Sequence, residues 1–319
     1  MRSARSIIPA LLLGALTAAA APRTGTAPAA SAFMRAEDAA KQHGFAPVRN
    51  SGGAYFVSGK STLRFTPDKP VCVIDGVKVY QCFPSRRTSG GLTLTRFDAQ
   101  KTVGPLSPRR TGVFRHRVKT ITIDPGHGGR DRGAAGKYMI EKTATLLLAY
   151  RVAEILNRCG FEVHLTRYTD YYVPLAERCR IKKRHKSDLF VSIHFNAAEK
   201  KSFHGIETFA LTPAGAASTS GGPPLNKRFF GNYFDANNLL LAHTIQKTLL
   251  RRTGAFDRGV KRARFAVLKD IDAPGVLVEV GFVSNPREER LMLDPAYREK
   301  LARGIAEGIY AYQRLMLGR

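Results

Sequence analysis

The sequence predicts an α/β protein whose mostly parallel sheet is covered by helices on both faces and is preceded by a small α+β domain. Two observations support this class. From residue 120 onward, short runs rich in β-branched residues alternate with longer amphipathic runs, and such alternation is typical of a parallel sheet with helical crossovers. Before residue 105, one helical stretch is followed by short strand-like runs separated by Gly, Pro and Asp-Gly turns, which indicates a small mixed unit.

The first third of the chain divides by composition. Residues 1–21 place two arginines before an apolar run that ends in small residues, and we expect a cleaved signal peptide, with an uncleaved membrane anchor as the alternative. The Ala-, Pro- and Thr-rich residues 22–32 predict a flexible leader. We expect the small α+β domain over residues 33–105, with targeting as its candidate role, and a linker over residues 106–118.

Within the small domain, residues 71–74 and 77–82 form a predicted hairpin around Asp75-Gly76, a dipeptide typical of type I′ turns. This register places Cys72 opposite Val79, so a direct disulfide between Cys72 and Cys82 is doubtful. Cys159 and Cys179 complete the set, and none of the four has metal-ligand spacing. We expect packing residues or disulfides, with the pairing left open. The remaining predicted elements are a helix over 36–43 and strands over 54–58 and 63–66.

Residues 119–316 carry the regular alternation of strands and helices. The helix over residues 141–158 has apolar residues at helical spacing and stops at Gly160. A polar, Gly- and Pro-rich interruption covers residues 213–230, and loops of this length are usually functional or disordered. We expect strands over 120–124, 161–166, 189–194, 205–211, 263–268 and 276–282, and further helices over 174–186, 235–251 and 296–315.

The chain is strongly basic, with 51 Lys and Arg against 25 Asp and Glu and a formal net charge of +26. Such a surface attracts polyanions, although a merely solvated basic surface is the alternative. The export signal and the absence of RNA-binding motifs that combine basic and aromatic residues count against nucleic acid. We therefore expect anionic envelope polymers or lipid head groups as partners of the basic surface, and no nucleic acid.

Four residues with metal or acid–base chemistry lie at or beside predicted strand ends: His127, Glu141, His194 and Glu279. Active groups of open α/β sheets gather at the carboxyl ends of the strands. Two imidazoles and one carboxylate are a ligand set of catalytic zinc with an open fourth position, and a second carboxylate could act as general base.

Each of these residues also has a plainer explanation. A single histidine at a strand end is usually only hydrogen-bonded, and Glu141 could stabilise the positive end of its helix. Glu279 is harder to explain in this way, because it lies in an almost entirely apolar run and a buried carboxylate is costly unless it is paired or functional. Spacing alone leaves the zinc hypothesis open.

Five short segments occur in one order along residues 119–316: Ile-Asp-Pro-Gly-His-Gly-Gly at 123–129, Glu-Lys at 141–142, Leu-Thr-Arg at 165–167, Ser-Ile-His-Phe-Asn-Ala at 192–197 and Val-Glu-Val-Gly-Phe-Val-Ser-Asn at 278–285. With these segments, residues 119–316 resemble the catalytic domain of N-acetylmuramoyl-L-alanine amidases, the amidase type 3 family. The resemblance implies one zinc ion held by His127, Glu141 and His194, with Glu279 as the catalytic carboxylate. It implies hydrolysis of the amide bond between the N-acetylmuramoyl lactyl group and L-alanine of peptidoglycan stem peptides.

Two segments depart from the family pattern. The family commonly has Asp-Pro-Gly where this chain has Asp131-Arg132-Gly133, which changes a loop near the metal without removing a ligand. Residues 213–230 occupy the region where some relatives carry an occluding helix, and their Ser, Gly and Pro content predicts no such helix here.

The small domain at 33–105 is weakly similar to the N-terminal domains named after copper amine oxidases, which occur on exported wall proteins.

These observations together predict an exported hydrolase of the periplasm or cell wall with peptidoglycan as its substrate. A zinc peptidase that cuts another peptidoglycan bond and a non-catalytic wall-binding protein are the alternatives. We expect a monomer, and an activator protein stays open, as do the stem-peptide preference and the biological role.

Overall fold

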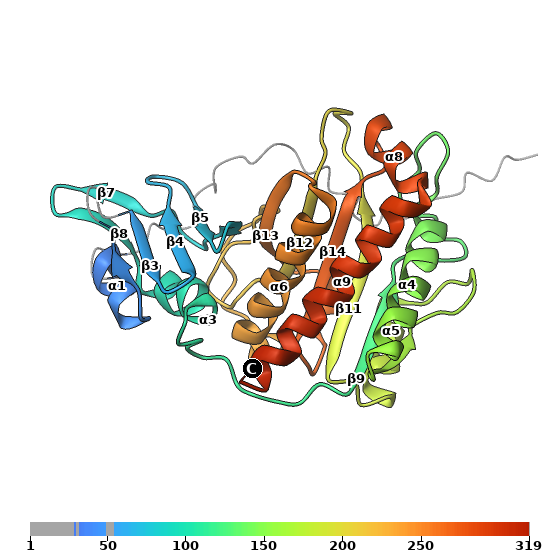
Figure 1. The fold of residues 1–319 in the computed structure, drawn as a ribbon, viewed down its shortest axis with the longest axis horizontal. Coiled ribbons are helices and arrows are strands. Elements are labelled where there is room, and N and C mark those ends of the chain that lie inside the picture. Colours follow the sequence, from blue (N-terminus) through green and yellow to red (C-terminus); the bar gives the residue numbers. More distant parts are fainter. Residues whose placement is uncertain (1–28, 30–31, 49–53, 319) are drawn as a thin grey trace, which may run out of the picture.

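The computed structural model describes residue 29, residues 32–48 and residues 54–318 of the chain (Figure 1). The predicted signal peptide and most of the predicted leader lie outside these residues. No helix in the described part of the chain is long and apolar enough to cross a membrane.

A mixed sheet of 11 strands runs through the described residues (Figure 1). At one end of it, four strands are parallel neighbours in the order β10-β9-β11-β14. β12 then pairs antiparallel with β14, and β13 pairs parallel with β12. The bounds of these strands are β9 Thr120–Pro125, β10 Glu162–Leu165, β11 Leu189–Asn196, β12 Ile206–Leu211, β13 Asp257–Ala263 and β14 Gly275–Phe282.

The N-terminal region extends this sheet as an antiparallel meander. β6 pairs with β13 at Val79 and Val260, and β5, β4, β3 and β2 follow toward the far edge. The hairpin register places Cys72 opposite Val79, as predicted, and all four cysteines are free thiols. The strands are β2 Ala46–Pro47, β3 Tyr55–Ser58, β4 Ser61–Phe65, β5 Val71–Ile74 and β6 Val77–Tyr80.

A second small sheet and several short helices complete this region. β8 Gly91–Thr95 lies between β1 Phe33–Arg35 and β7 Arg86–Thr88. The first helix, α1 Ala36–Gln42, agrees with the prediction. The predicted linker has no regular element after Leu106, but its backbone is bonded to Asn237 and Gln313 of the long helices. The other helices here are α2 Arg96–Asp98, η2 Ala99–Val103 and α3 Gly104–Leu106.

Helices cover both faces of the half of the sheet that contains β9 to β14. Successive strand residues point to opposite faces, so Val191 packs in the core under the long helices while Phe190 packs in a second core on the other face. The first face is covered by α4 Glu141–Arg158, α6 Asp235–Thr253 and α9 Pro295–Met316 (Figure 1). The second core includes residues of α7 Ala266–Lys269 and contacts Cys179 of α5 Leu175–Arg184.

One predicted strand is wrong. The sequence predicts a strand over 263–268, but the strand in the structure is β13 Asp257–Ala263, which ends where the predicted strand begins. The second half of the predicted segment belongs instead to the short helix α7 Ala266–Lys269. The strand was missed because it contains Lys261 and Arg262, which read as solvent-exposed residues. Both are buried, and their charged groups bond to partners far away in the sequence, described below. α8 Pro286–Leu293 and η3 Phe230–Phe234 were also not predicted.

Candidate metal centre and active site

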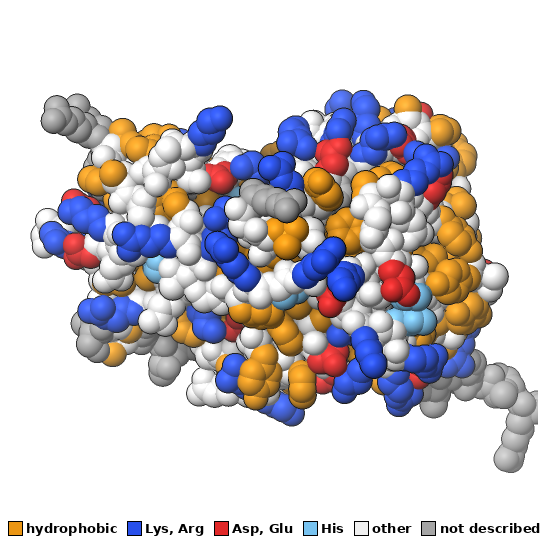
Figure 2. Space-filling view, turned by 60° about the horizontal axis from the view of Figure 1, so that its bottom comes forward, with side chains coloured by type: hydrophobic (Ala, Val, Ile, Leu, Met, Phe, Trp, Pro, Cys, Tyr) orange, Lys and Arg blue, Asp and Glu red, His pale blue; other side chains and the backbone are white. Residues whose placement is uncertain are grey.

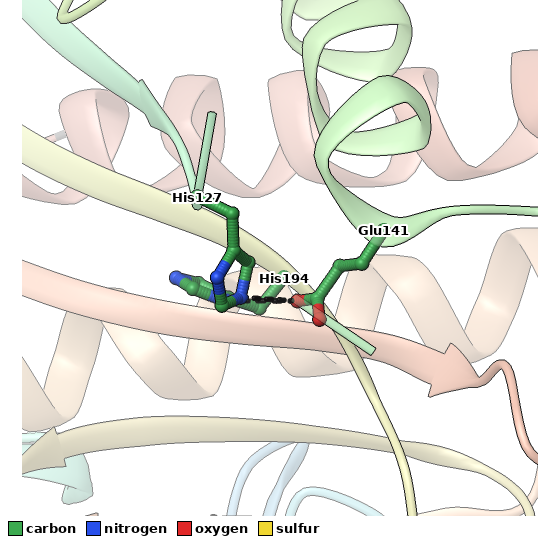
Figure 3. Close-up of side chains that lie close together, drawn as sticks. All are labelled: His127, Glu141 and His194. Carbon is green, nitrogen blue, oxygen red and sulfur yellow. Dashed lines mark hydrogen bonds and ion pairs between the residues drawn. The ribbon is translucent and has the colours of Figure 1, made fainter. Parts of the chain in front are cut away.

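The four candidate residues converge at the carboxyl edge of the parallel strands. His127 follows β9, His194 lies near the end of β11, and Glu279 lies in β14 directly beside His194 in the strand register. Glu141 is the first residue of α4 and points back toward the same edge (Figure 3). The alternation of strands and helices therefore brings together residues that lie far apart in the sequence.

His127, Glu141 and His194 turn donor atoms toward one point (Figure 3). Oε1 of Glu141 lies 3.1 Å from Nε2 of His127 and 3.0 Å from Nδ1 of His194. One ligand atom from each residue lies within 4.8 Å of the other two. The donor set, two imidazoles and a carboxylate, is that of a catalytic zinc site, so the residues fit a zinc ion.

The backbone around His127 is shaped for this approach. His127 has φ +61°, a left-handed conformation that is uncommon for a residue with a side chain and is often found at functional sites. A Cβ at Gly126 would lie 2.3 Å from Cε1 of His194, and a Cβ at Gly133 would lie 2.6 Å from Oε2 of Glu141. Glycine is therefore required at both positions for the imidazoles and the carboxylate to meet.

Further groups orient the ligands. Nδ1 of His127 lies 2.9 Å from Oδ1 of Asp131, which leaves Nε2 for the centre of the cluster. The backbone N–H of Ala134 donates to Oε2 of Glu141, and that of Phe195 donates to Oε1. Partners of this kind hold metal ligands in position. The sequence analysis named Asp131 only as part of a loop that departs from the family pattern and not as the partner of His127, although a carboxylate four residues after a candidate ligand is a usable signal.

The cluster shifts the pKa values of its members. Burial alone would raise the pKa of Glu141, but hydrogen bonds from His127 and His194 outweigh it and lower that pKa. Burial would lower the pKa of His127, whereas the carboxylates of Glu141 and Asp131 raise it on balance. The carboxylate is thus kept ionised, as a metal ligand must be.

A buried salt bridge lies beneath the site. Arg178 of α5 donates to Oδ1 of Asp124 at 2.6 Å and, through its other terminal nitrogen, to the carbonyl of His127 at 2.8 Å. Ser192 donates to the second oxygen of Asp124. Arg167 donates to the carbonyls of Pro125 and Gly126. These arginines therefore support the loop that carries His127.

Glu279 lies beside the cluster, at the register position of β14 that pairs with His194. Its side chain is partly buried, and Oε2 is buried with no hydrogen-bond partner among the described residues. Burial raises the pKa of Glu279 well above its ordinary value, and the nearby charges of Glu141 and Glu207 raise it further. A carboxylate with a raised pKa next to a candidate metal site has the properties of a general acid and base.

A second carboxylate, which is buried, lies next to Glu279 on the neighbouring strand of the sheet. Glu207 of β12 is the antiparallel register partner of Glu279 and is fully buried. It accepts bonds from Lys261 at 2.6 Å and Arg258 at 2.8 Å, and from Asn196 at 2.8 Å. The side-chain amide of Asn196 is thus engaged with Glu207. The sequence signal for Glu207 was the same as for Glu279, a carboxylate in an apolar strand.

Comparison with known proteins identifies relatives of residues 121–311, which match the family model described as N-acetylmuramoyl-L-alanine amidase. The curated amidase AmiA of Escherichia coli (strain K12) is 35% identical over 219 residues, which cover 61% of this chain and 76% of AmiA. LytC of Bacillus subtilis (strain 168) is 37% identical over 196 residues, which cover 61% of this chain and 36% of LytC.

Solved structures of amidases share the fold. The catalytic domain of CwlV, from Bacillus (Paenibacillus) polymyxa var. colistinus, is 32% identical with a TM-score of 0.52, and the match covers 61% of this chain and 97% of that domain. The CwlD amidase from Clostridioides difficile, solved in complex with the GerS lipoprotein, is 31% identical with a TM-score of 0.53 and matches 62% of this chain and 99% of CwlD. The predicted α/β class is confirmed. The family match includes none of residues 33–105, so the resemblance predicted there stays a prediction.

Proposed function

Because the chain belongs to the N-acetylmuramoyl-L-alanine amidase family, with its match over residues 121–311, we propose that it is a zinc-dependent hydrolase of peptidoglycan. The bond cut is the amide between the N-acetylmuramoyl lactyl group and L-alanine of the stem peptide. The observation that supports this proposal is the convergence of donor atoms from His127, Glu141 and His194 within 4.8 Å of one another. Beside them lies Glu279, whose buried Oε2 has no hydrogen-bond partner among the described residues.

In this proposal His127, Glu141 and His194 hold one zinc ion. A zinc ion there supplies Lewis acidity, which polarises the scissile carbonyl and makes water a nucleophile near neutral pH. Glu279 accepts a proton from the attacking water and returns it to the amine of the departing L-alanine, so the amide C–N bond breaks without a covalent enzyme intermediate. Its raised pKa suits both steps, because the carboxyl group must accept and then release the same proton.

Substitution of Glu279 tests the assignment of roles. Glu279→Gln should lower kcat by about 10²- to 10⁴-fold while the protein keeps about one zinc ion, measured by elemental analysis. The matched control is Glu199→Gln, which changes an exposed carboxylate in the same way. A Glu279→Gln variant that hydrolyses wall at the normal rate would refute the role of Glu279.

The products released from purified wall test the bond that is cut. Free amino termini of L-alanine support the amidase, whereas new termini at D-amino acids would identify a zinc peptidase acting on another peptidoglycan bond. Absence of products from a protein that contains zinc would favour the non-catalytic wall-binding alternative.

The remaining proposals concern the whole chain. We propose export by residues 1–21 to the periplasm or cell wall, a flexible leader at 22–32, a small domain at 33–105, a linker at 106–118 and a catalytic domain at 119–316, acting as a monomer. The solved complex of the related CwlD amidase with the GerS lipoprotein supports a partner protein as an open alternative.

A further inference from the structure

A basic and aromatic surface lies at the end of the sheet where the parallel strands begin. Figure 2, turned so that this end comes forward, shows Lys and Arg side chains interleaved with apolar ones. The surface is formed by the end of α5, the segment before η3, η3 itself and α7. We call it the basic–aromatic face and define it by Lys183, Lys186, Lys227, Arg228, Phe230, Tyr233 and Lys269.

Contacts between cations and rings join these segments into one surface. The guanidinium of Arg228 lies 3.9 Å from the ring centroid of Tyr233. The ammonium of Lys183, from α5, lies 5.8 Å from the ring of Phe230 in η3. The rings of Phe230 and Tyr233 are 5.7 Å apart. Residues from separate parts of the chain therefore form a continuous face rather than scattered exposed side chains.

The rings of this face are left open to solvent. Phe230 is 55% exposed and Tyr233 is 60% exposed. Lys183 and Lys186 of this face also line a groove of about 460 Å³, together with Phe114, Asp188 and Asp272, and Phe114 is 42% exposed. Large exposed rings grouped in this way mark an interaction surface more often than single exposed residues do.

The cations of the face are not neutralised by carboxylates of the described residues. None of the five Lys and Arg residues that define it forms an ion pair with a carboxylate in the part of the chain that the structure describes. Lys182, their neighbour, is instead paired with Asp272 at 2.7 Å, and Asp270 is the exposed carboxylate next to Lys269. The face therefore keeps an excess of positive charge for an anionic partner.

The basic–aromatic face and the metal cluster lie at opposite ends of the sheet. The groove includes Asp188 and Pro274, which precede β11 and β14, while His194 and Glu279 lie toward the carboxyl ends of those strands. The eight residues of β11 separate the two ends by about 23 Å, at a rise of about 3.3 Å per residue. A partner bound at this face would leave the metal cluster accessible.

We propose that the basic–aromatic face binds the anionic lipid head groups of a membrane surface and directs the metal cluster away from the membrane. Lipid explains both features of the face: anionic head groups attract the cations, and rings such as Phe230 and Tyr233 fit the boundary between head groups and acyl chains. A soluble anionic polymer would use the charges but would offer less to the exposed rings.

The test uses the protein purified after export, with vesicles of phosphatidylcholine alone or mixed with phosphatidylglycerol. Each cation near an anionic surface contributes about fivefold to affinity, so Lys183→Gln with Arg228→Gln should weaken binding to the anionic vesicles about 25-fold. Phe230→Ser with Tyr233→Ser keeps the charge and should weaken binding about tenfold. Inorganic polyphosphate serves as the soluble polyanion, and its binding should be weakened by the charge variant but not by the ring variant.

The charge-matched control is Arg287→Gln with Arg290→Gln, two exposed cations of α8, and it should keep nearly the original vesicle affinity. Equal losses in the face and α8 variants would overturn the proposal, because the attraction would then come from net charge. A ring variant that keeps full affinity for the anionic vesicles would also overturn the proposal. So would a ring variant whose affinity for polyphosphate falls as well, because that result would indicate a site for a polymer or nucleic acid. Binding is measured without turnover, so none of these results depends on the proposed amidase activity.

Discussion

Substitution of Gly126 by alanine is expected to damage the metal cluster without removing any ligand. The left-handed conformation is not required at Gly126, so alanine is tolerated by the backbone itself. Its Cβ, however, would lie 2.3 Å from Cε1, 2.5 Å from Nε2 and 2.7 Å from Nδ1 of His194. Carbon atoms in ordinary contact are about 3.5–4.0 Å apart, so the imidazole must move by roughly 1.2 Å or more.

This displacement exceeds what the site can absorb. Metal–ligand distances are held to within about 0.2 Å, so His194 would no longer complete the ligand set with His127 and Glu141. A misplacement of about 1 Å costs on the order of 10²-fold in rate. We expect Gly126→Ala to lose zinc during dialysis against a chelator and to have kcat/KM for purified wall lowered at least about 100-fold.

For each variant we would measure the zinc content by elemental analysis, the rate of wall hydrolysis and the melting temperature. The matched control is Gly90→Ala, since a Cβ there would approach nothing closer than Oγ1 of Thr88 at 4.0 Å. Overpacking costs about 1–3 kcal/mol, so the Gly126 variant should melt at a lower temperature but stay folded in the assay. A Gly126→Ala protein with full zinc content and normal kcat/KM would show that His194 does not need the observed position.

Three further outcomes follow from the site. Asp131→Asn should weaken zinc affinity about 10- to 100-fold, because the partner that orients His127 is altered; competition with a chromogenic chelator measures it, and unchanged affinity would argue against this role. Arg178→Met should destabilise the fold by about 3–5 kcal/mol in urea unfolding, because Asp124 keeps a buried charge without its cation; a loss below about 1 kcal/mol would contradict the argument. Because the pKa of Glu279 is raised, its deprotonated form, which acts as the base, forms only above the usual pH range of a carboxyl group. A plot of kcat/KM against pH should therefore have an acid limb whose pKa lies above the ordinary glutamate value of about 4.3. An acid limb at that ordinary value would refute the role of Glu279 as the base.

Most of the catalytic fold could be predicted because its signals are local. The helix predicted over 141–158 has those bounds in the structure, and β9, β11 and β14 lie where apolar runs predicted them. Hydrophobic periodicity and helix-breaking residues such as Gly160 determine structure within a few residues of the chain. The family resemblance then indicated the order in which the predicted strands and helices follow one another. The same signals did not predict β13, because this buried strand contains the charged residues Lys261 and Arg262.

The pairing of distant charges could not be predicted from local pattern. Lys261 is buried because Glu207, 54 residues earlier, accepts its bond, and Arg262 is buried with its guanidinium on the carbonyl of Lys101, 161 residues earlier. No periodicity rule connects such positions. The proximity of Glu207 to Glu279 was hidden for the same reason, since the two carboxylates meet only through the antiparallel pairing of β12 with β14.

The order of residues along the chain was thus enough to select the fold class and to name His127, Glu141, His194 and Glu279 as candidates, because side-chain chemistry and repeating pattern are written in the chain itself. Only the tertiary structure decided that three of them share one point, that Asp131 and Arg178 support that point, and that a basic–aromatic face lies at the opposite end of the sheet. These are distances through space, and they arise from packing between segments that the sequence keeps far apart.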